Sequence, residues 1–133
     1  MKRLSLAILV ACIAFSLSAC KTARISSEPS DITESFFSAF ESSDYETMKN
    51  YCTANCIETY FHDGDVDGMV WAKLTERGEE EISDDRIVHV FVTVEMETAE
   101  TSALYPSTET SFYVEFLRDD DNVWLINGFP TGR

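Results

Sequence analysis

The segment RIVHVFVTVEMET, residues 86–98, constrains the fold most strongly, because its apolar and polar residues alternate. One face of this segment is wholly apolar and holds Val88, Val90, Val92, Val94 and Met96. The other face is mixed and holds Ile87, His89, Phe91, Thr93, Glu95 and Glu97. A period of two over this length predicts a long β-strand with one face packed against a core.

Three further segments have strand character. TETSFYVEFLR, residues 108–118, repeats the alternation, and VWLINGF, residues 123–129, predicts a closing strand. Between them, DDDN at residues 119–122 has the composition of a turn. VWAKLTE, residues 70–76, predicts a weaker strand ahead of the long one.

The chain before the strands has helical periodicity. After the helix-starting Ser30 and Asp31, apolar residues recur at helical spacing at Ile32, Phe36, Phe37 and Phe40. Asp44 is suited to cap a second helix that stops near Asn55. The buried face of that helix would hold Tyr45, Met48 and Cys52. Residues 57–61 add one or two helical turns.

Helices followed by a meander of strands predict an α+β fold. We expect the N-terminal helices to pack on one face of a curved antiparallel β-sheet. A strand as long as residues 86–98 must twist and coil, so the sheet should curl around the helices. About 105 residues remain after the leader and tether described next, which is enough for one domain.

The N-terminus, MKRLSLAILVACIAFSLSACK, has the organisation of a secretory signal. Lys2 and Arg3 precede an apolar run at residues 4–17, which is shorter than the roughly 20 residues that span a bilayer. LSAC, ending at Cys20, resembles the bacterial lipobox. The resemblance implies that residues 1–19 are cleaved and that Cys20 is acylated.

This resemblance also implies a location and a domain plan. Acyl chains on Cys20 would hold the chain at the extracytoplasmic face of the cell membrane, since each buried CH₂ contributes about 0.8 kcal/mol. Residues 20–30 would be the acylated cysteine and a flexible tether, and residues 31–133 a single domain. The alternatives are an ordinary cleaved signal with a chance cysteine and an uncleaved anchor.

The charge of the chain excludes one class of partner. The full sequence has 10 Lys plus Arg against 24 Asp plus Glu, a formal charge of −14. Removal of residues 1–19 takes away two basic residues and no acid, which leaves −16. Nucleic-acid binding needs a basic face, so we expect no nucleic-acid partner.

Two cysteines, Cys52 and Cys56, remain in the domain. A disulfide is permitted outside the cytoplasm. The spacing i, i+4 within a regular helix aims the two Cβ atoms poorly for a bridge, which becomes easier if the helix ends near Asn55. The alternative is a pair of partly buried thiols.

The stretch HDGDVDG, residues 62–68, has two interpretations. Asp63, Asp65 and Asp67 match the first half of an EF-hand loop and make calcium a candidate ligand. The match fails at the twelfth position, which is Leu74 instead of a glutamate. The other interpretation is a helix-to-strand turn, in which Gly64 and Gly68 take special backbone angles and Asp63 and Asp65 accept hydrogen bonds from nearby amides.

Four segments together carry a family resemblance: YCTANC, YFHDGDVDGMVWAKL, VEMETAETSALYPSTETSFYV and WLINGFPTG. They resemble a bacterial lipoprotein family of uncharacterised domains in the nuclear-transport-factor-2-like superfamily. The resemblance implies a cone, in which three helices pack against a strongly curved antiparallel sheet. The wider superfamily includes isomerases, dehydratases, cyclases and non-catalytic binding modules, so no catalytic residue carries over.

Four residues are candidates for a pocket or a contact surface: Trp71, His89, Tyr105 and Tyr113. His89 shares its strand face with Glu95, and Glu115 and Tyr113 can join it across the sheet. A histidine beside a carboxylate can perform acid–base catalysis. Tyr105, before a proline, is suited to contact a partner from a loop tip.

We expect a non-catalytic lipoprotein that binds a small ligand, a peptide or a neighbouring envelope protein, without a cofactor. Nothing in the sequence fixes a substrate beside His89 or places a serine in a nucleophile elbow. Two alternatives remain, namely a cone-fold enzyme of the isomerase or dehydratase type and a calcium-binding module.

Overall fold

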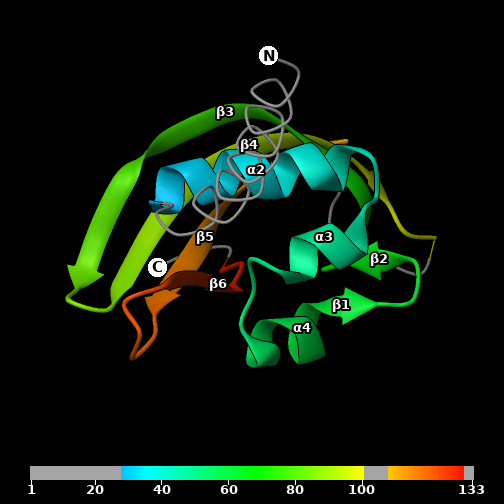
Figure 1. Ribbon diagram of the computed structural model, residues 1–133. Helices are drawn as coiled ribbons and strands as arrows, with labels where there is room; N and C mark the ends of the chain where they lie inside the picture. The colour runs from blue at the N-terminus through cyan, green and yellow to red at the C-terminus, as the bar shows by residue number, and fades with distance from the viewer. Residues whose placement is uncertain (1–27, 101–107, 131–133) are drawn as a thin grey trace, which may run out of the picture.

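The computed structural model describes residues 28–100 and 108–130, and it confirms the α+β class. The helices are α2 (Pro29–Glu41), α3 (Tyr45–Lys49) and α4 (Ala54–Tyr60). The strands are β1 (Phe61–His62), β2 (Asp65–Val66), β3 (Met69–Asp84), β4 (Ile87–Thr98), β5 (Glu109–Arg118) and β6 (Trp124–Gly128). They form one antiparallel sheet in the order β1-β2-β3-β4-β5-β6, which does not close, and β3 and β4 arch over α2 (Figure 1).

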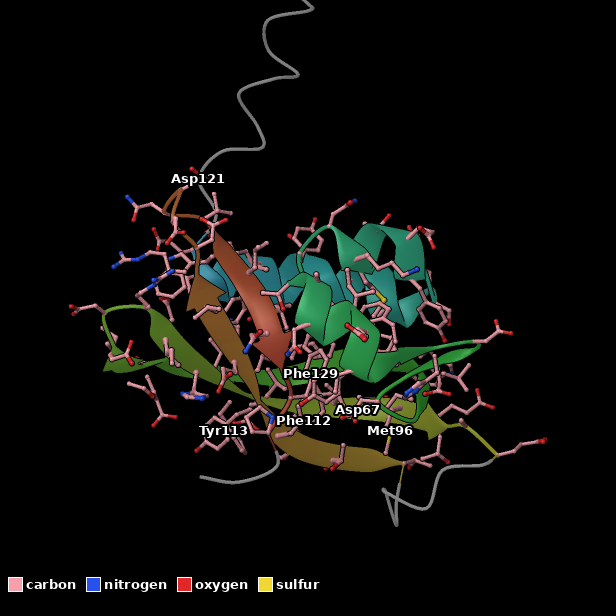
Figure 2. All side chains as sticks on the ribbon, turned by 90° about the horizontal axis from the view of Figure 1, so that it is seen from below. Asp67, Met96, Phe112, Tyr113, Asp121 and Phe129 are labelled. Atoms are coloured by element: carbon pink, nitrogen blue, oxygen red, sulfur yellow. The ribbon has the colours of Figure 1, made fainter. Side chains whose placement is uncertain are left out.

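The core lies between α2 and the sheet and is rich in aromatic rings. From α2 come Phe36, Phe37 and Phe40, and the Phe36 and Phe37 rings meet edge to face at 5.2 Å. Phe112 of β5 and Phe129 after β6 meet them from the other side, with their own centroids 6.0 Å apart. Figure 2 shows these two rings in the core, whereas Tyr113 points to the other side of the sheet.

The predicted faces of β4 and β5 are confirmed. All five residues of the apolar face of β4 are buried: Val88, Val90, Val92, Val94 and Met96. Their neighbours on β5 are also buried: Phe112, Val114 and Phe116. Successive side chains of a strand point to opposite faces of the sheet, and only one face packs against α2. Burial therefore alternates along both strands with a period of two residues.

The prediction for residues 70–76 was too short, because β3 extends from Met69 to Asp84. Beyond residue 76 this strand is mostly charged and solvent-exposed, and it pairs with β4 through several register shifts. Hydrophobic alternation therefore does not mark it. Among the described residues, β2 pairs with β3 only at Val66 and Met69, so most of the outer edge of β3 has no strand beside it.

The helix boundaries differ from the prediction in two places. α2 begins at Pro29 with Glu28 as its N-cap, slightly before the predicted start, because the fixed φ of proline suits the first helical position. Asp44 caps α3 as predicted, but α3 ends at Lys49 and Asn55 lies inside α4, so the predicted stop at Asn55 is wrong. Thr53 starts a new helix there.

The break between α3 and α4 has a long-range cause. The amide of Thr53 donates to the carbonyl of Ile126 at 2.9 Å, and the amide of Ile126 donates to the carbonyl of Tyr51 at 2.7 Å. Residues 51–53 are therefore held against β6, and Thr53 among them is extended. The hydroxyl of Thr53 then accepts from the amide of Cys56 at 3.1 Å and caps α4.

No helix within residues 28–100 and 108–130 is long and apolar enough to cross a membrane. The predicted signal peptide at residues 1–19, Cys20 and Tyr105 lie outside the described residues.

Candidate functional site

The face of the sheet turned away from α2, here called the outer face, carries the candidate residues of β4 and β5. Antiparallel pairing sets Phe91 opposite Tyr113, His89 opposite Glu115 and Ile87 opposite Leu117. Residues opposite each other on one face have Cβ atoms about 5 Å apart, so these side chains meet. The prediction that Glu115 and Tyr113 join His89 is confirmed.

His89 lies between a hydroxyl and a carboxylate. Its Nε2 is 3.1 Å from Oε2 of Glu115, and its Nδ1 is 2.9 Å from Oγ of Ser83. Because an ionised carboxylate only accepts, a neutral imidazole donates to Glu115 from Nε2 and accepts from Ser83 at Nδ1. The His89 side chain is only 14% exposed and that of Glu115 is 30% exposed, so water screens the pair only in part.

The hydrogen bonds continue beyond Glu115. Nδ2 of Asn127 donates to Oε1 of Glu115 at 3.1 Å, and the hydroxyl of Thr53 donates to Oδ1 of Asn127 at 3.0 Å. Ser83, His89, Glu115, Asn127 and Thr53 thus form a polar row from β3 across β4, β5 and β6 to the start of α4. Both oxygens of Glu115 are engaged, which fixes the orientation of the imidazole.

An aromatic pair lies beside the polar row. The rings of Phe91 and Tyr113 are 5.3 Å apart, and the ring of Tyr113 meets His89 edge-on at 6.1 Å. Phe91 is 38% exposed, although it lies in the middle of a strand. Across from it, a Cβ on Gly78 would be 3.3 Å from Cβ of Phe91. A glycine on β3 therefore leaves one flank of the Phe91 side chain uncovered.

This arrangement can do two things chemically. The exposed ring of Phe91, supported by Tyr113, offers an apolar contact beside oriented hydrogen-bonding groups, which is how protein contact surfaces are built. Independently, a hydroxyl beside an imidazole that is oriented by a carboxylate is the geometry of an activated nucleophile.

Trp71 lies elsewhere on the sheet. It lines an open groove of about 520 Å³ together with Glu95, Met96, Glu97, Thr98, Thr108 and Glu109. Its indole Nε1 donates to Oε2 of Glu97 at 2.9 Å. Glu97 is eight residues from His89 along β4, about 26 Å in a strand. The structure therefore does not bring Trp71 together with His89.

The aspartate segment forms two tight hairpin turns. Asp63 and Gly64 connect β1 to β2, and Gly64 has φ +93°. Asp67 and Gly68 connect β2 to β3 with φ values of 52° and 82°, and positive φ at both positions is what a type I′ turn requires. The special backbone angles predicted for Gly64 and Gly68 are confirmed, but the segment joins strands in two hairpins and is not a single helix-to-strand turn.

The carboxylate of Asp65 holds these turns together. Its Oδ1 accepts from the amide of Gly68 at 2.9 Å and is 2.9 Å from Nδ1 of His62. Within residues 28–100 and 108–130, no three acidic, histidine or cysteine side chains gather in a way that could hold a metal ion. Calcium binding at Asp63, Asp65 and Asp67 thus stays a prediction.

Among the residues that the structure describes, the fully buried side chains between α2 and the sheet include no carboxylate, imidazole or ammonium group. They are apolar, apart from the thiols of Cys52 and Cys56 and the hydroxyl of Thr33, which donates to the carbonyl of Pro29 at 2.7 Å. His89 and Glu115 lie on the outer face instead.

Comparison of this chain with known proteins does not identify a function. No protein-family model matches this chain, and neither a curated protein nor a solved structure is significantly similar to it. The geometry of the outer face is therefore the basis for the functional inference.

Sequence reasoning missed three members of the polar row: Ser83, Asn127 and Thr53. Ser83 reaches His89 only because β3 runs on as a charged strand after residue 76. Asn127 and Thr53 meet through the pairing of residues 51–53 with β6. The alternation in WLING would have placed Asn127 opposite the buried Ile126 face, but no local signal marks Thr53.

Proposed function

We propose that this chain is a lipid-anchored, extracytoplasmic binding module that recognises a neighbouring envelope protein through its outer sheet face. The observation that carries the proposal is the exposed Phe91 ring, which meets Tyr113 edge to face beside the oriented pair of His89 and Glu115. Aromatic rings beside satisfied polar groups are typical of interface centres.

The filled core supports binding at the surface. Phe36, Phe37, Phe40, Phe112 and Phe116 are each at most 1% exposed and occupy the space between α2 and the sheet. A ligand in that space would have to displace packed rings, and each Phe→Ala change in a core costs about 3–5 kcal/mol. An exposed ring on the outer face can be covered by a partner without that cost.

We also propose that the fold is the cone of the nuclear-transport-factor-2-like superfamily. Three features support it: the described helices precede the main strands, the sheet is antiparallel and open, and β3 and β4 arch over α2. In that superfamily non-catalytic modules occur beside enzymes, which fits a role in binding.

The anchoring half of the proposal depends on Cys20. LSAC at residues 17–20 follows a positive and then an apolar segment, the order that a lipoprotein signal requires. Mass spectrometry of protein from native membranes should find an N-terminal peptide that starts at an acylated Cys20. A chain that still starts at Met1, recovered without lipid from the cytosol, would refute anchoring.

Site-specific photo-crosslinking tests the recognition surface. A photoreactive phenylalanine analogue at position 91, introduced into the full-length membrane-bound protein, should give an adduct of one discrete mass. The photoreactive group would stand in place of the exposed Phe91 ring, which the bound partner covers under this proposal, so it would react with that partner.

Position 82 supplies the matched control. Ile82 is 80% exposed, but it pairs with Val88, whose side chain faces the core side of the sheet. The same analogue at position 82 should give no such adduct. Equal adducts from positions 91 and 82, or none from either, would reject the outer face as the recognition surface.

A second candidate is an acyl-transfer or hydrolytic activity at Ser83, favoured by the contacts of His89 with Ser83 and Glu115. A fluorophosphonate probe should then label Ser83, and Ser83→Ala and His89→Ala should both abolish labelling. Ser111→Ala is the control, since Ser111 is on the same face but bonds to Thr93. Absence of label on the wild-type chain would reject this activity.

A further inference from the structure

Cys52 and Cys56 lie together where α4 begins. Both thiols belong to the buried core, with Cys52 7% exposed and Cys56 0% exposed. Cys52 pairs with Ile126 in an isolated parallel bridge beside β6, and Cys56 lies in the first turn of α4.

The break in the helix changes the geometry of their spacing. In one continuous helix, residues i and i+4 point along the same face with their Cβ atoms aimed poorly for a bridge. Here Thr53 between them is extended, with φ −70° and ψ 159°. Cys52 thus precedes the N-cap and Cys56 is the third residue of the helix.

A residue just before the N-cap packs over the first turn of a helix, which is the turn that holds Cys56. The bond from the Cys56 amide to the Thr53 hydroxyl, at 3.1 Å, holds Cys56 in that place. On the other side, Sγ of Cys52 donates to the carbonyl of Met48 at 3.4 Å.

The two thiols are also in direct contact. Interaction with the side chain of Cys56, followed by burial, raises the pKa of the Cys52 thiol well above its ordinary value. A thiol with a raised pKa is a poor nucleophile in the folded state, because the thiolate is the reactive form.

We propose that Cys52 and Cys56 form an intrachain disulfide in the mature protein. The presence of an oxidant rests on the extracytoplasmic location proposed above, because disulfides persist in oxidising compartments. The oxidant is a donor disulfide, either of a thiol-oxidising protein or of a small molecule.

The reaction is thiol–disulfide exchange. One cysteine loses its proton and attacks the donor, forming a mixed disulfide and releasing one donor thiolate. The second cysteine loses its proton, attacks the mixed disulfide and releases the other. The protein gives up two protons and two electrons, and the donor disulfide is reduced to two thiols.

The timing follows from the burial of the pair. In the folded dithiol the Cys52 thiolate is scarce and Cys56 is inaccessible, so exchange proceeds before α4 docks on β6. The bond then fixes Thr53 between the two cysteines, and Thr53 is the end of the polar row on the outer face.

One peptide reports on the bond. Cleavage after Lys49 and Lys73 releases residues 50–73, which contain both cysteines. Full-length protein from native membranes is quenched in acid, denatured and alkylated with iodoacetamide without reductant. We expect this peptide without alkyl groups, two hydrogens lighter than the dithiol, and doubly alkylated only after reduction.

Several results would overturn the disulfide. Two alkyl groups without reduction, in a chain whose Cys20 carries lipid, would show a dithiol in the oxidising compartment. A small thiol attached to either cysteine would show that the pair does not close.

A second measurement tests the Cys52–Cys56 disulfide independently of the proposed extracytoplasmic location. Reduced full-length protein in detergent is unfolded and refolded with oxidised glutathione, beside a Cys56→Ser variant. The wild type should close its disulfide and carry no glutathione, whereas Cys56→Ser should carry one on Cys52. Native protein could prove to be an unlipidated dithiol and still form the disulfide in this refolding experiment. That result would refute the proposed extracytoplasmic location and support the proposed Cys52–Cys56 disulfide. If the wild type does not form the Cys52–Cys56 disulfide during refolding, the proposed disulfide is refuted.

Discussion

Asp65 is the single residue on which the aspartate turns most depend. Its side chain is 15% exposed and its carboxylate oxygen contacts both His62 and the amide of Gly68. Loss of a partly buried acceptor leaves the amide of Gly68 unsatisfied, which costs about 1–3 kcal/mol. The three aspartates look alike in the sequence, and the structure shows Asp65 in contact with both β1 and the turn that follows β2.

We therefore expect Asp65→Ala to lower the free energy of unfolding in urea by about 1–2 kcal/mol. Asp63→Ala is the matched control, because Asp63 is exposed, and it should change stability by less than about 0.5 kcal/mol. Added calcium should leave both unfolding midpoints unchanged. A calcium-induced rise in the wild-type midpoint that disappears in Asp65→Ala would instead establish a calcium site.

Tyr45 makes stability depend on alkaline pH. Burial, assisted by the charge of Asp65 and opposed by a hydrogen bond from Ser43, raises the pKa of the Tyr45 hydroxyl above its ordinary value of 10.0. The hydroxyl donates to the carbonyl of Val70, and the carbonyl of Gly64 is 3.0 Å away. Two acceptor oxygens beside it would repel a phenolate.

The sign of this effect follows from proton binding. The folded state holds the Tyr45 proton more tightly than the unfolded state, so the contribution is complete below about pH 10 and is lost as pH rises through the folded pKa. We expect the urea midpoint of the wild type to fall more steeply between pH 9 and pH 11 than that of Tyr45→Phe. Parallel curves would contradict this assignment.

Among the elements, the start of α4 depends on Thr53. This residue caps the helix through Cys56, pairs with Ile126 of β6 and donates to Asn127 of the polar row. α4 has only seven residues, so its own propensity is too weak to hold it without capping and docking.

Replacement of Thr53 separates these roles. Thr53→Ala should lower the free energy of unfolding by about 1–2 kcal/mol, the usual effect of losing an N-cap. Thr53→Ser keeps a hydroxyl and should recover most of that loss. Chemical denaturation of both variants measures the difference, and equal losses in Ala and Ser would show that the methyl group rather than the cap matters.

Elements with local signals were predictable from the sequence. The faces of β4 and β5 follow from alternation, and the pairing of His89 with Glu115 follows from placing two adjacent strands side by side. The second half of β3 was missed because its residues are charged and its partner alone makes it a strand. The α3–α4 break was missed because Thr53 meets Ile126, far away in the chain, and no local pattern encodes that contact.

On the scale of the whole molecule, like charge opposes compaction. The chain carries a formal charge of −14, and −16 without residues 1–19, whereas the described ion pairs of lysine and arginine are surface pairs such as Lys49–Glu46 and Arg86–Asp120. Surface pairs contribute little, so self-repulsion is incompletely offset.

Salt should therefore stabilise the protein. The screening length falls from about 30 Å at 0.01 M salt to about 10 Å at 0.1 M, which weakens repulsion between distant carboxylates. We expect the urea midpoint to rise over this range equally in sodium and potassium chloride. A midpoint that falls with salt would show that attractive pairs dominate instead.

Under the proposed lipid anchoring, the long outer edge of β3 has a consequence for copies of this chain that lie side by side on one bilayer. An unpaired strand edge is a template on which another strand can grow, and crowding raises the rate of such encounters. Here the edge beyond residue 76 is charged and broken by register shifts, and both features prevent a continuous ladder from forming. At high density on the bilayer, these domains would accordingly stay separate rather than polymerise into fibrils.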